Sequence, residues 1–339
     1  MPQRRVPQAW PADRRFRILS LDGGGIRGVF PATVLAELER RYTGGRSIGD
    51  YFDLFAGTST GGILGLGLGA GLTGVELQEL YVVRGREVFP PLPDGLYGRL
   101  RGWWRDGLHY VRHRYDRTAL EALLKDRLGA DRLFGESRVR LVIPAFEGGR
   151  SEVLVYKTPH HPDYRTDRYK PMVTVGLATA AAPAYYRPLE DEGYVLVDGG
   201  VWANNPVMLA VIEALTCFTV EPTQIDVLTI GCGDDPYIVS PKQIRLGGRF
   251  FWRTALFAAM RLQSLAATNQ ARLLLGPLSV VRVDAPTNER EIALDDWRRS
   301  VDELVPAAVA SVEAIGDRIA DQFLTAPTHP YVPLPEQPP

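Results

Sequence analysis

The sequence is poor in cysteine, in long apolar runs and in unbalanced charge. It has only two cysteines, Cys217 and Cys232, among 339 residues, which gives neither a disulfide framework nor a cysteine-based zinc site and suits a reducing cytoplasm. Its longest weakly polar run, residues 61–72, is far shorter than the roughly 20 residues that a transmembrane helix needs. No apolar stretch follows the arginines of residues 1–17, so we expect no signal peptide.

The charge balance and the composition are those of an ordinary globular protein. The formal net charge is -1, with 45% apolar and 23% charged residues, so we expect no bulk attraction to nucleic acid or to anionic membranes. The sequence shows no repeat, linker or low-complexity insert. We therefore predict a flexible N-terminal segment (residues 1–14), one folded domain (residues 15–324) and a proline-rich tail (residues 325–339).

Alternating strand and helix patterns predict the α/β class. Short apolar runs bounded by glycine or proline indicate strands, and apolar residues spaced three to four apart indicate helices. Strands are expected at residues 16–21, 51–56, 138–145, 152–156, 193–197, 226–231 and 279–284. Helices are expected at residues 29–42, 61–72, 73–87, 118–128, 171–182, 207–215, 247–275 and 297–323, the last with a break at Pro306.

Gly57, Ser59 and Gly61 form a G-x-S-x-G motif between a predicted strand and an apolar predicted helix. In that setting the serine lies on a sharp strand-to-helix turn, where small neighbours are needed because the two backbones nearly touch. The hydroxyl of Ser59 would then face a cleft, close to the positive end of the helix dipole. The motif also occurs by chance in glycine-rich loops, but this context favours a nucleophile.

A second glycine-rich loop, Asp22-Gly23-Gly24-Gly25-Ile26-Arg27-Gly28, also joins a predicted strand to a predicted helix. It fits the dinucleotide-binding pattern G-x-G-x-x-G, and Asp50 follows Gly28 by 22 residues, although Asp50 precedes its strand instead of ending it. Alternatively, the glycine N–H groups would bind a developing oxyanion, with Arg27 adding positive charge or anchoring the loop. A plain structural turn is the third interpretation.

Asp198, Gly199 and Gly200 end another predicted strand, where α/β folds keep catalytic groups. By itself, Asp-Gly-Gly is typical of a turn. A serine nucleophile needs a base, but only His329 follows Asp198, so a triad in the order Ser-Asp-His is poorly supported. A Ser-Asp dyad needs no histidine, because burial raises the basicity of a carboxylate.

Two adjacent histidines and two basic segments complete the candidate sites. No further cluster with ligand spacing surrounds His160 and His161, so we predict no metal there. Residues 99–117 and 242–253 combine arginine with aromatic residues. Residues 99–117 are either a solvated face with partial burial, or a lid over the active site, a lipid-surface contact or an anionic-ligand site. The helix at 247–275 either packs as a core helix or has its front end at the mouth of the cleft. Either basic segment could bind phosphates, which arginine forks suit.

The three motifs together resemble those of patatin-like phospholipases. They occur in the family's order, each at a strand end, and the resemblance covers roughly residues 16–285. It implies a three-layer α/β/α patatin-like fold with a mostly parallel central sheet, and an acyl ester hydrolase without metal or other cofactor. Ser59 is implied as the nucleophile and Asp198 as the base. The implied oxyanion hole, which replaces the dinucleotide interpretation, comprises Gly23, Gly24, Gly25, Arg27 and Gly28.

A finer resemblance concerns Thr-Pro-His-His-Pro at residues 158–162, Ala-Thr-Ala-Ala-Ala-Pro at 178–183 and residues 198–206. These are similar to bacterial anti-phage phospholipases that a cyclic nucleotide switches on. The similarity implies a phospholipid substrate, a cyclic di- or trinucleotide activator and no nucleic acid polymer. It also implies a cytoplasmic protein acting peripherally on the inner membrane, and it is compatible with an oligomer. The alternatives are a constitutive patatin-like esterase or lipase, and a non-catalytic nucleotide-binding module that uses the loop from Gly23 to Gly28.

Overall fold

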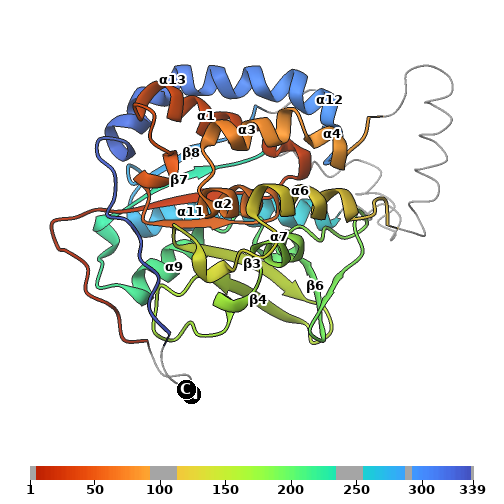
Figure 1. The fold of residues 1–339 in the computed structure, drawn as a ribbon. Helices are drawn as coiled ribbons and strands as arrows, with labels where there is room; N and C mark the ends of the chain where they lie inside the picture. Colours follow the sequence, from red (N-terminus) through yellow and green to blue (C-terminus); the bar gives the residue numbers. More distant parts are fainter. Residues whose placement is uncertain (1–4, 92–112, 234–254, 287–291, 337–339) are drawn as a thin grey trace, which may run out of the picture.

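The computed structural model describes residues 5–91, 113–233, 255–286 and 292–336, and it has a central mixed sheet between two layers of helices (Figure 1). The strand order is β5-β6-β3-β2-β1-β7-β8, with β4 paired to β3 off this path. The strands are β1 (Phe16–Leu21), β2 (Leu54–Gly57), β3 (Leu141–Glu147), β4 (Glu152–Lys157), β5 (Leu189–Asp191), β6 (Tyr194–Asp198), β7 (Ile225–Ile230) and β8 (Val280–Val283).

Parallel pairing in the centre of the sheet brings several strand ends to one edge. β1 runs parallel to β2 and β7, with Leu21 opposite Gly57 and Ile230. β2 is also parallel to β3, and β7 to β8. β6 is antiparallel to β3 and places Asp198 opposite Ala145. The prediction of a mostly parallel sheet is therefore confirmed, and the loops after β1 and β2 begin side by side.

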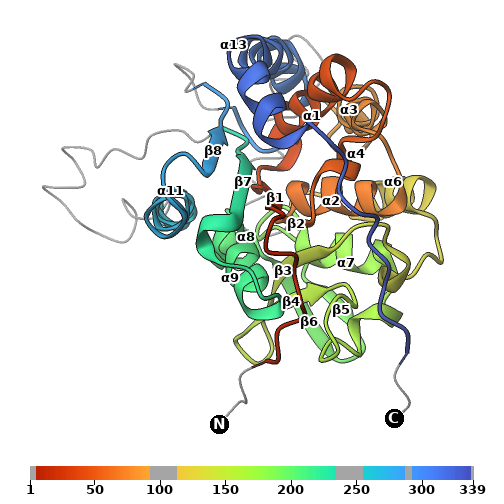
Figure 2. The ribbon, with the colours of Figure 1, turned by 90° about the vertical axis from the view of Figure 1, so that its left-hand side faces the viewer.

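The helices cover both faces of the sheet, and each layer has its own apolar core (Figure 2). One layer contains α1 (Val29–Tyr42), α2 (Thr60–Ala70), α3 (Gly74–Val82), α4 (Gly85–Val88), α6 (Thr118–Leu128), α7 (Met172–Thr179), α12 (Trp297–Arg299) and α13 (Val305–Phe323). The other contains α8 (Gly200–Ala203), α9 (Val207–Cys217) and α11 (Ala255–Leu275). The three-layer α/β/α arrangement is thus present.

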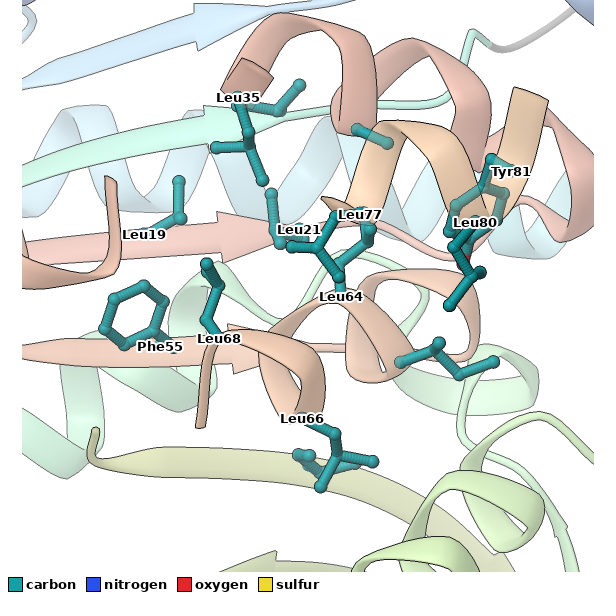
Figure 3. Packing of buried hydrophobic residues seen from close by; sticks show 14 of the residues in the cluster. Leu19, Leu21, Leu35, Phe55, Leu64, Leu66, Leu68, Leu77, Leu80 and Tyr81 are labelled. Carbon is teal, nitrogen blue, oxygen red and sulfur yellow. The ribbon is translucent and has the colours of Figure 1, made fainter. Parts of the chain in front are cut away.

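Helix α2 is buried along its whole length, as its small-residue sequence predicts. All 11 of its residues are buried, and Figure 3 shows Leu64, Leu66 and Leu68 among leucines of the neighbouring strands and helices. Its glycines let it approach those elements closely. A Cβ on Gly62, for example, would lie 2.8 Å from Thr179 Cγ2. This close packing fixes the start of α2, and therefore the position of Ser59, against the sheet.

Several predicted boundaries differ from those observed. The strand expected at residues 51–56 begins only at Leu54, because Ile48–Tyr51 forms a 3-10 helix capped by Ser47. The helix expected at 73–87 divides into α3 and α4, and Thr73 and Glu76 form a capping box at the start of α3. The helix expected at 171–182 ends at Thr179. Of the helix expected at 247–275, residues 247–254 lie outside the described residues.

The break expected at Pro306 lies just before that residue. The α-helical pattern stops at Arg299, a π-helical turn follows at Ser300–Leu304, and α13 begins at Val305 with Pro306 in its first turn. Proline is favoured in the first turn of an α-helix because its fixed φ suits the helix. The sequence alone does not indicate where the π-helical turn ends.

The terminal segments that the sequence predicts to be loose make specific contacts where the structure describes them. Gln8 is bridged to the chain beside α9, since its N–H donates to Cys217 O and its carbonyl accepts from Thr219 N–H, both at 2.8 Å. At the other end, Leu334 N–H donates to Pro159 O at 2.9 Å. Among the described residues, no helix is both long and apolar enough to cross a membrane.

Candidate active site

Ser59 occupies the turn between β2 and α2 with a strained backbone. Its φ of 54° and ψ of -118° are unusual for a residue with a side chain. The Ser59 N–H donates to Thr179 Oγ1 at 3.0 Å, and Thr179 in turn donates to Pro144 O at 2.7 Å. Thr58 Oγ1 donates to Ala203 O at 2.6 Å. These bonds hold the turn in the conformation that presents the Ser59 hydroxyl.

The glycines of the turn are required by close backbone contacts. A Cβ on Gly57 would lie 2.2 Å from Gly61 O, and a Cβ on Gly61 would lie 2.2 Å from Leu21 O. Gly199, next to Asp198, meets the backbone in the same way, because its Cβ would lie 2.3 Å from Pro144 O. A larger residue at Gly57 or Gly61 would push α2 away from the sheet, and a larger residue at Gly199 would push the end of β6 away from β3.

Asp198 ends β6 and contacts Ser59. Ser59 Oγ donates to Asp198 Oδ2 at 2.7 Å, and the Gly200 N–H donates to Asp198 Oδ1 at 2.7 Å. Asp198 is only 5% exposed. Burial raises the pKa of Asp198 to about 6, against the opposing effect of the two hydrogen bonds. The carboxylate is therefore a stronger base than an exposed aspartate while still charged at neutral pH.

The glycine loop lies next to Ser59, since a Cβ on Gly23 would lie 3.4 Å from Ser59 Cβ, but the amides of the loop differ in availability. The N–H of Gly23 donates to Asn204 O at 3.0 Å, and the N–H of Arg27 donates to Gly24 O at 3.1 Å. No acceptor among the described residues is recorded for the N–H of Gly24 or Gly25. Gly28 serves close packing, since a Cβ there would lie 2.2 Å from Thr60 Oγ1. Of the five predicted oxyanion residues, Gly24 and Gly25 are thus the candidate donors.

Arg282 anchors the first residue of the glycine loop, and no sequence motif points to it. It lies on β8, and its two terminal nitrogens donate to Asp22 Oδ1 and Oδ2 at 2.9 and 2.7 Å. The same guanidinium contacts Asp284 Oδ2 at 2.6 Å and Thr229 Oγ1 at 2.9 Å. A bidentate pair of this kind fixes orientation as well as distance. The only sequence signal is an arginine inside an apolar predicted strand.

A cavity of about 610 Å³ opens beside Ser59, Asp198 and the glycine loop. Ser59, Asp198, Gly24 and Arg27 all contribute to its lining. The remaining wall is largely apolar, and α2, α3, α4 and α6 contribute Ile63, Leu80, Val88, Leu120, Leu123 and Leu124 to it. An apolar cavity with a few polar groups at one end is suited to a ligand that is mostly hydrocarbon.

The histidines of the described residues do not contact the dyad. His329 is exposed in the C-terminal tail and His113 is exposed before α6, while His160 and His161 hydrogen-bond to Glu213 and to Val6 O. The recorded hydrogen bonds of the Ser59 hydroxyl and the Asp198 carboxylate go to each other and to Gly200. His109 lies outside the described residues.

The two basic segments lie largely outside the described residues, which include only 113–117 of residues 99–117 and none of residues 242–253. Within 113–117, Arg114 forms an ion pair with Asp295 at 2.9 Å, and Arg117 donates to Pro188 O at 3.0 Å. Arg114 and Arg117 therefore link the segment before α6 to the segments that contain Asp295 and Pro188.

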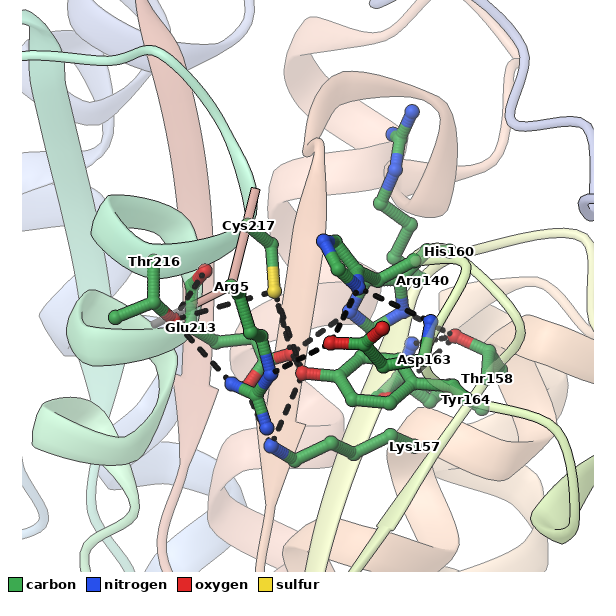
Figure 4. Close-up of polar contacts among 12 residues, drawn as sticks. Arg5, Arg140, Lys157, Thr158, His160, Asp163, Tyr164, Glu213, Thr216 and Cys217 are labelled. Carbon is green, nitrogen blue, oxygen red and sulfur yellow. Dashed lines mark hydrogen bonds and ion pairs between the residues drawn. The ribbon is translucent and has the colours of Figure 1, made fainter. Parts of the chain in front are cut away.

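The structure brings together three potential metal ligands that the sequence does not connect. His160, Glu213 and Cys217 are buried with their ligand atoms within 4.8 Å of one another (Figure 4). Lys157 Nζ, however, lies 2.7 Å from Glu213 Oε2. Burial opposes the charged form of Glu213, but His160 and Lys157 hold the pKa of Glu213 well below its usual range. Because the ammonium already balances this carboxylate, the cluster is satisfied as a hydrogen-bonded network without an ion.

Comparisons with known proteins agree with the motifs. Residues 19–211 match the family model described as patatin-like phospholipase. A cGAMP-activated phospholipase of Escherichia coli (strain TW11681) is 34% identical over 244 residues, which cover 67% of this chain and 65% of that protein. One of the same name from Pseudomonas aeruginosa (strain BWHPSA011 / Pa011) is 37% identical over 201 residues, covering 59% and 57%. Patatin-like protein 2 of Oryza sativa subsp. japonica is 31% identical over 252 residues, covering 64% and 61%. The matched region is less than two thirds of the length of each of these relatives.

Proposed function

The chain belongs to the patatin-like phospholipase family, and from this premise we propose that it is a lipid acyl hydrolase with Ser59 as nucleophile and Asp198 as general base. The observation that supports the assignment most strongly is the 2.7 Å hydrogen bond from Ser59 Oγ to Asp198 Oδ2. Further support comes from the strained backbone of Ser59 and from the raised pKa of Asp198, about 6. A base of that pKa can accept a proton in the transition state near neutral pH.

The reaction is acyl transfer in two halves. Asp198 takes the proton of Ser59 as the hydroxyl oxygen attacks the ester carbonyl, and the tetrahedral oxyanion accepts hydrogen bonds from the N–H groups of Gly24 and Gly25. The carbon–oxygen bond to the leaving alcohol breaks as Asp198 returns the proton to that alcohol. Asp198 then activates water, which attacks the acyl-serine and releases the fatty acid. Losing one such oxyanion donor typically costs about 10²–10³ in rate.

The substrate class follows from the shape and polarity of the cavity. Its apolar wall, which includes six aliphatic side chains of α2, α3, α4 and α6, accommodates an acyl chain, with the ester beside Ser59 and the polar remainder toward the opening. We therefore propose membrane phospholipids as substrates, acted on from the cytoplasm at the surface of the inner membrane. The two free, buried cysteines are compatible with a reducing compartment.

The test of this function is hydrolysis of mixed phospholipid vesicles, read as free fatty acid by mass spectrometry. The parent chain should release fatty acid, and Ser59→Ala should abolish the release while leaving the fold intact by circular dichroism. Ser311→Ala is a matched control, because Ser311 lies on α13 and bonds only to Ala307 O of its own helix. Release by Ser59→Ala at the parent's rate would refute the nucleophile assignment and leave a constitutive esterase with another site, or a binding module, to be sought.

Control by a cyclic nucleotide is the second part of the proposal. It is favoured by one observation, namely that the two bacterial relatives described above are named as cGAMP-activated phospholipases. We expect one member of a panel of cyclic di- and trinucleotides to raise the rate of vesicle hydrolysis and to bind Ser59→Ala equally well. A rate that no member of the panel changes, with no binding in calorimetry, would favour a constitutive lipase.

The extent of the catalytic domain is proposed as residues 15–324. β1 begins at Phe16 and α13 ends at Phe323, and both Phe323 and Leu324 are buried in the larger core. A chain ending after residue 324 is expected to retain vesicle hydrolysis, although it loses the contact between the tail and Pro159.

A further inference from the structure

Helices α9 and α11 lie side by side on one face of the sheet (Figure 2). Both helices have exposed apolar side chains. On α11 the exposed residues include Leu262, Leu265 and Leu273, spaced so that they share one side of the helix. Leu273 is 87% exposed, Leu262 63% and, on α9, Ile212 50%. A surface helix normally has polar residues there, and exposed apolar patches commonly mark interaction sites.

The same two helices are almost free of negative charge. The sequence of α11 contains no aspartate or glutamate, and its charged residues are Arg261 and Arg272. The single carboxylate of α9, Glu213, is buried and bonded to Lys157. Arg272 is exposed, whereas Arg261 is partly buried and lines the cavity. The outer surface of α9 and α11 is therefore apolar, with one exposed positive charge. That combination is typical of protein surfaces that lie in the interface of an anionic membrane.

This surface is continuous with the candidate active site. Ala258, Met260 and Arg261 at the start of α11, and Val201 on α8, line the cavity that contains Ser59 and Asp198. Leu262 and Leu265 follow these residues within about one turn of helix. A bilayer in contact with the exposed leucines would therefore lie close to the lining of the cavity, from which a phospholipid could enter without first crossing water.

We propose that this α9–α11 face, formed by Ile212, Leu262, Leu265, Arg272 and Leu273, docks the protein on an anionic phospholipid bilayer. A second copy of the chain is a poorer occupant, because the exposed residues of α9 and α11 offer no carboxylate to pair with Arg272 of another copy, whereas an anionic bilayer supplies the opposite charge. The proposal rests on the proposed function, since it explains how a lipid hydrolase without a membrane-spanning helix among its described residues reaches its substrate.

The experiment is vesicle flotation with the variant L262Q/L265Q/L273Q, made in a Ser59→Ala background so that hydrolysis does not alter the vesicles. None of the three leucines lines the cavity. The background protein should float with vesicles of phosphatidylcholine and phosphatidylglycerol, more weakly with phosphatidylcholine alone, and less as salt is raised. The triple variant should bind about tenfold less or weaker still, because each leucine would bury apolar area in the interface. A matched control, V83Q/V153Q/V332Q, changes three exposed valines on other elements and should float like the background protein.

Two further measurements separate this inference from the proposed function. With Ser59 restored, the triple variant should hydrolyse a soluble short-chain ester at the parent's rate but release less fatty acid from vesicles. Inactivity of the parent on both substrates, with and without the panel of cyclic nucleotides, would refute the proposed function, while flotation would still decide the docking. Equal flotation of the triple variant and the background protein would overturn the docking surface. Light scattering that shows a dimer in the parent and a monomer in the variant, with flotation unchanged, would overturn it in favour of an interface between copies.

Discussion

Ser59 and Asp198 are 139 positions apart in the chain, yet Ser59 Oγ lies 2.7 Å from Asp198 Oδ2. Their meeting follows from the sheet. Ser59 comes just after the end of β2, Asp198 is the last residue of β6, and both strands pair with β3. The second oxygen of Asp198 is held by the Gly200 N–H, so the carboxylate cannot turn away from the serine. The pair is positioned by backbone packing before any substrate binds.

The first prediction concerns the pH dependence of hydrolysis. Burial raises the pKa of Asp198 to about 6, and only the deprotonated carboxylate can take the serine proton. We expect kcat/KM for a soluble ester to be constant above pH 7 and to fall about tenfold for each pH unit below 6. Asp198→Asn should lose activity by about 10³-fold or more at all pH values. An inflection near pH 4, as for an exposed aspartate, would contradict the role of burial.

The second prediction concerns the effect of Asp198 on the free energy of unfolding. A rise in pH should lower this energy through Asp198, whereas it would raise it through a salt-bridged carboxylate. The folded-state pKa of Asp198, about 6, lies above the ordinary 3.8, so the folded state binds the proton more tightly. This proton contributes favourably to the free energy of unfolding below about pH 4, and the contribution is lost as the pH rises through 6. We expect Asp198→Asn to gain stability relative to the parent by about 1 kcal/mol between pH 5 and pH 7.5. Urea unfolding at the two pH values measures it, and a difference independent of pH would contradict it.

The third prediction concerns Arg282 as a positioning residue for the glycine loop. Arg282→Lys keeps the positive charge but loses the paired contacts with Asp22, so the loop should be less well oriented. We expect kcat to fall about tenfold with KM little changed, because the amides of the loop act mainly in the transition state. Arg282→Met should instead destabilise the fold by about 3–5 kcal/mol, since it removes the arginine partner of the buried Asp22 carboxylate.

The matched control for that prediction is Arg299→Lys. Arg299 bonds to Glu303 four residues further on, near the surface, at 2.8 Å. Its replacement should change neither kcat nor stability measurably, because exposed ion pairs contribute little. A rise in KM without any change in kcat for Arg282→Lys would show that Arg282 acts on substrate binding and not on the loop.

The sequence was sufficient for the parts of the site that are encoded locally. Gly57, Gly61 and Gly199 indicate turns in which a Cβ would meet backbone atoms. Each motif therefore requires small residues for a reason that can be read within the motif itself. Arg282 was missed because its partners, Asp22 and Thr229, lie on other strands and meet it only after the sheet has formed. The buried cluster of His160, Glu213 and Cys217 was missed for the same reason. The π-helical form of the break before Pro306 was not predicted, because nothing in the local sequence of Ser300–Leu304 distinguishes it from an ordinary α-helical turn.

The last prediction tests whether contact between α2 and β1 positions the serine. In Gly61→Ala the new Cβ would lie 2.2 Å from Leu21 O, a backbone atom at the end of β1 that cannot move without disturbing the sheet. Helix α2 would have to shift, and Ser59 at its start would shift with it. We expect a loss of about 2–4 kcal/mol in the free energy of unfolding and a fall in kcat of about 10²-fold.

Gly65→Ala on the same helix is the control for Gly61→Ala. Its Cβ would meet only Leu141 Cδ2, at 3.4 Å, which is an ordinary contact. Alanine favours the helix by about 1 kcal/mol over glycine, so Gly65→Ala should leave the free energy of unfolding unchanged or raised, with normal kcat. Denaturant unfolding and ester hydrolysis on both variants decide the matter. If Gly61→Ala were as active and as stable as Gly65→Ala, the contact with Leu21 would not be what holds Ser59 against Asp198.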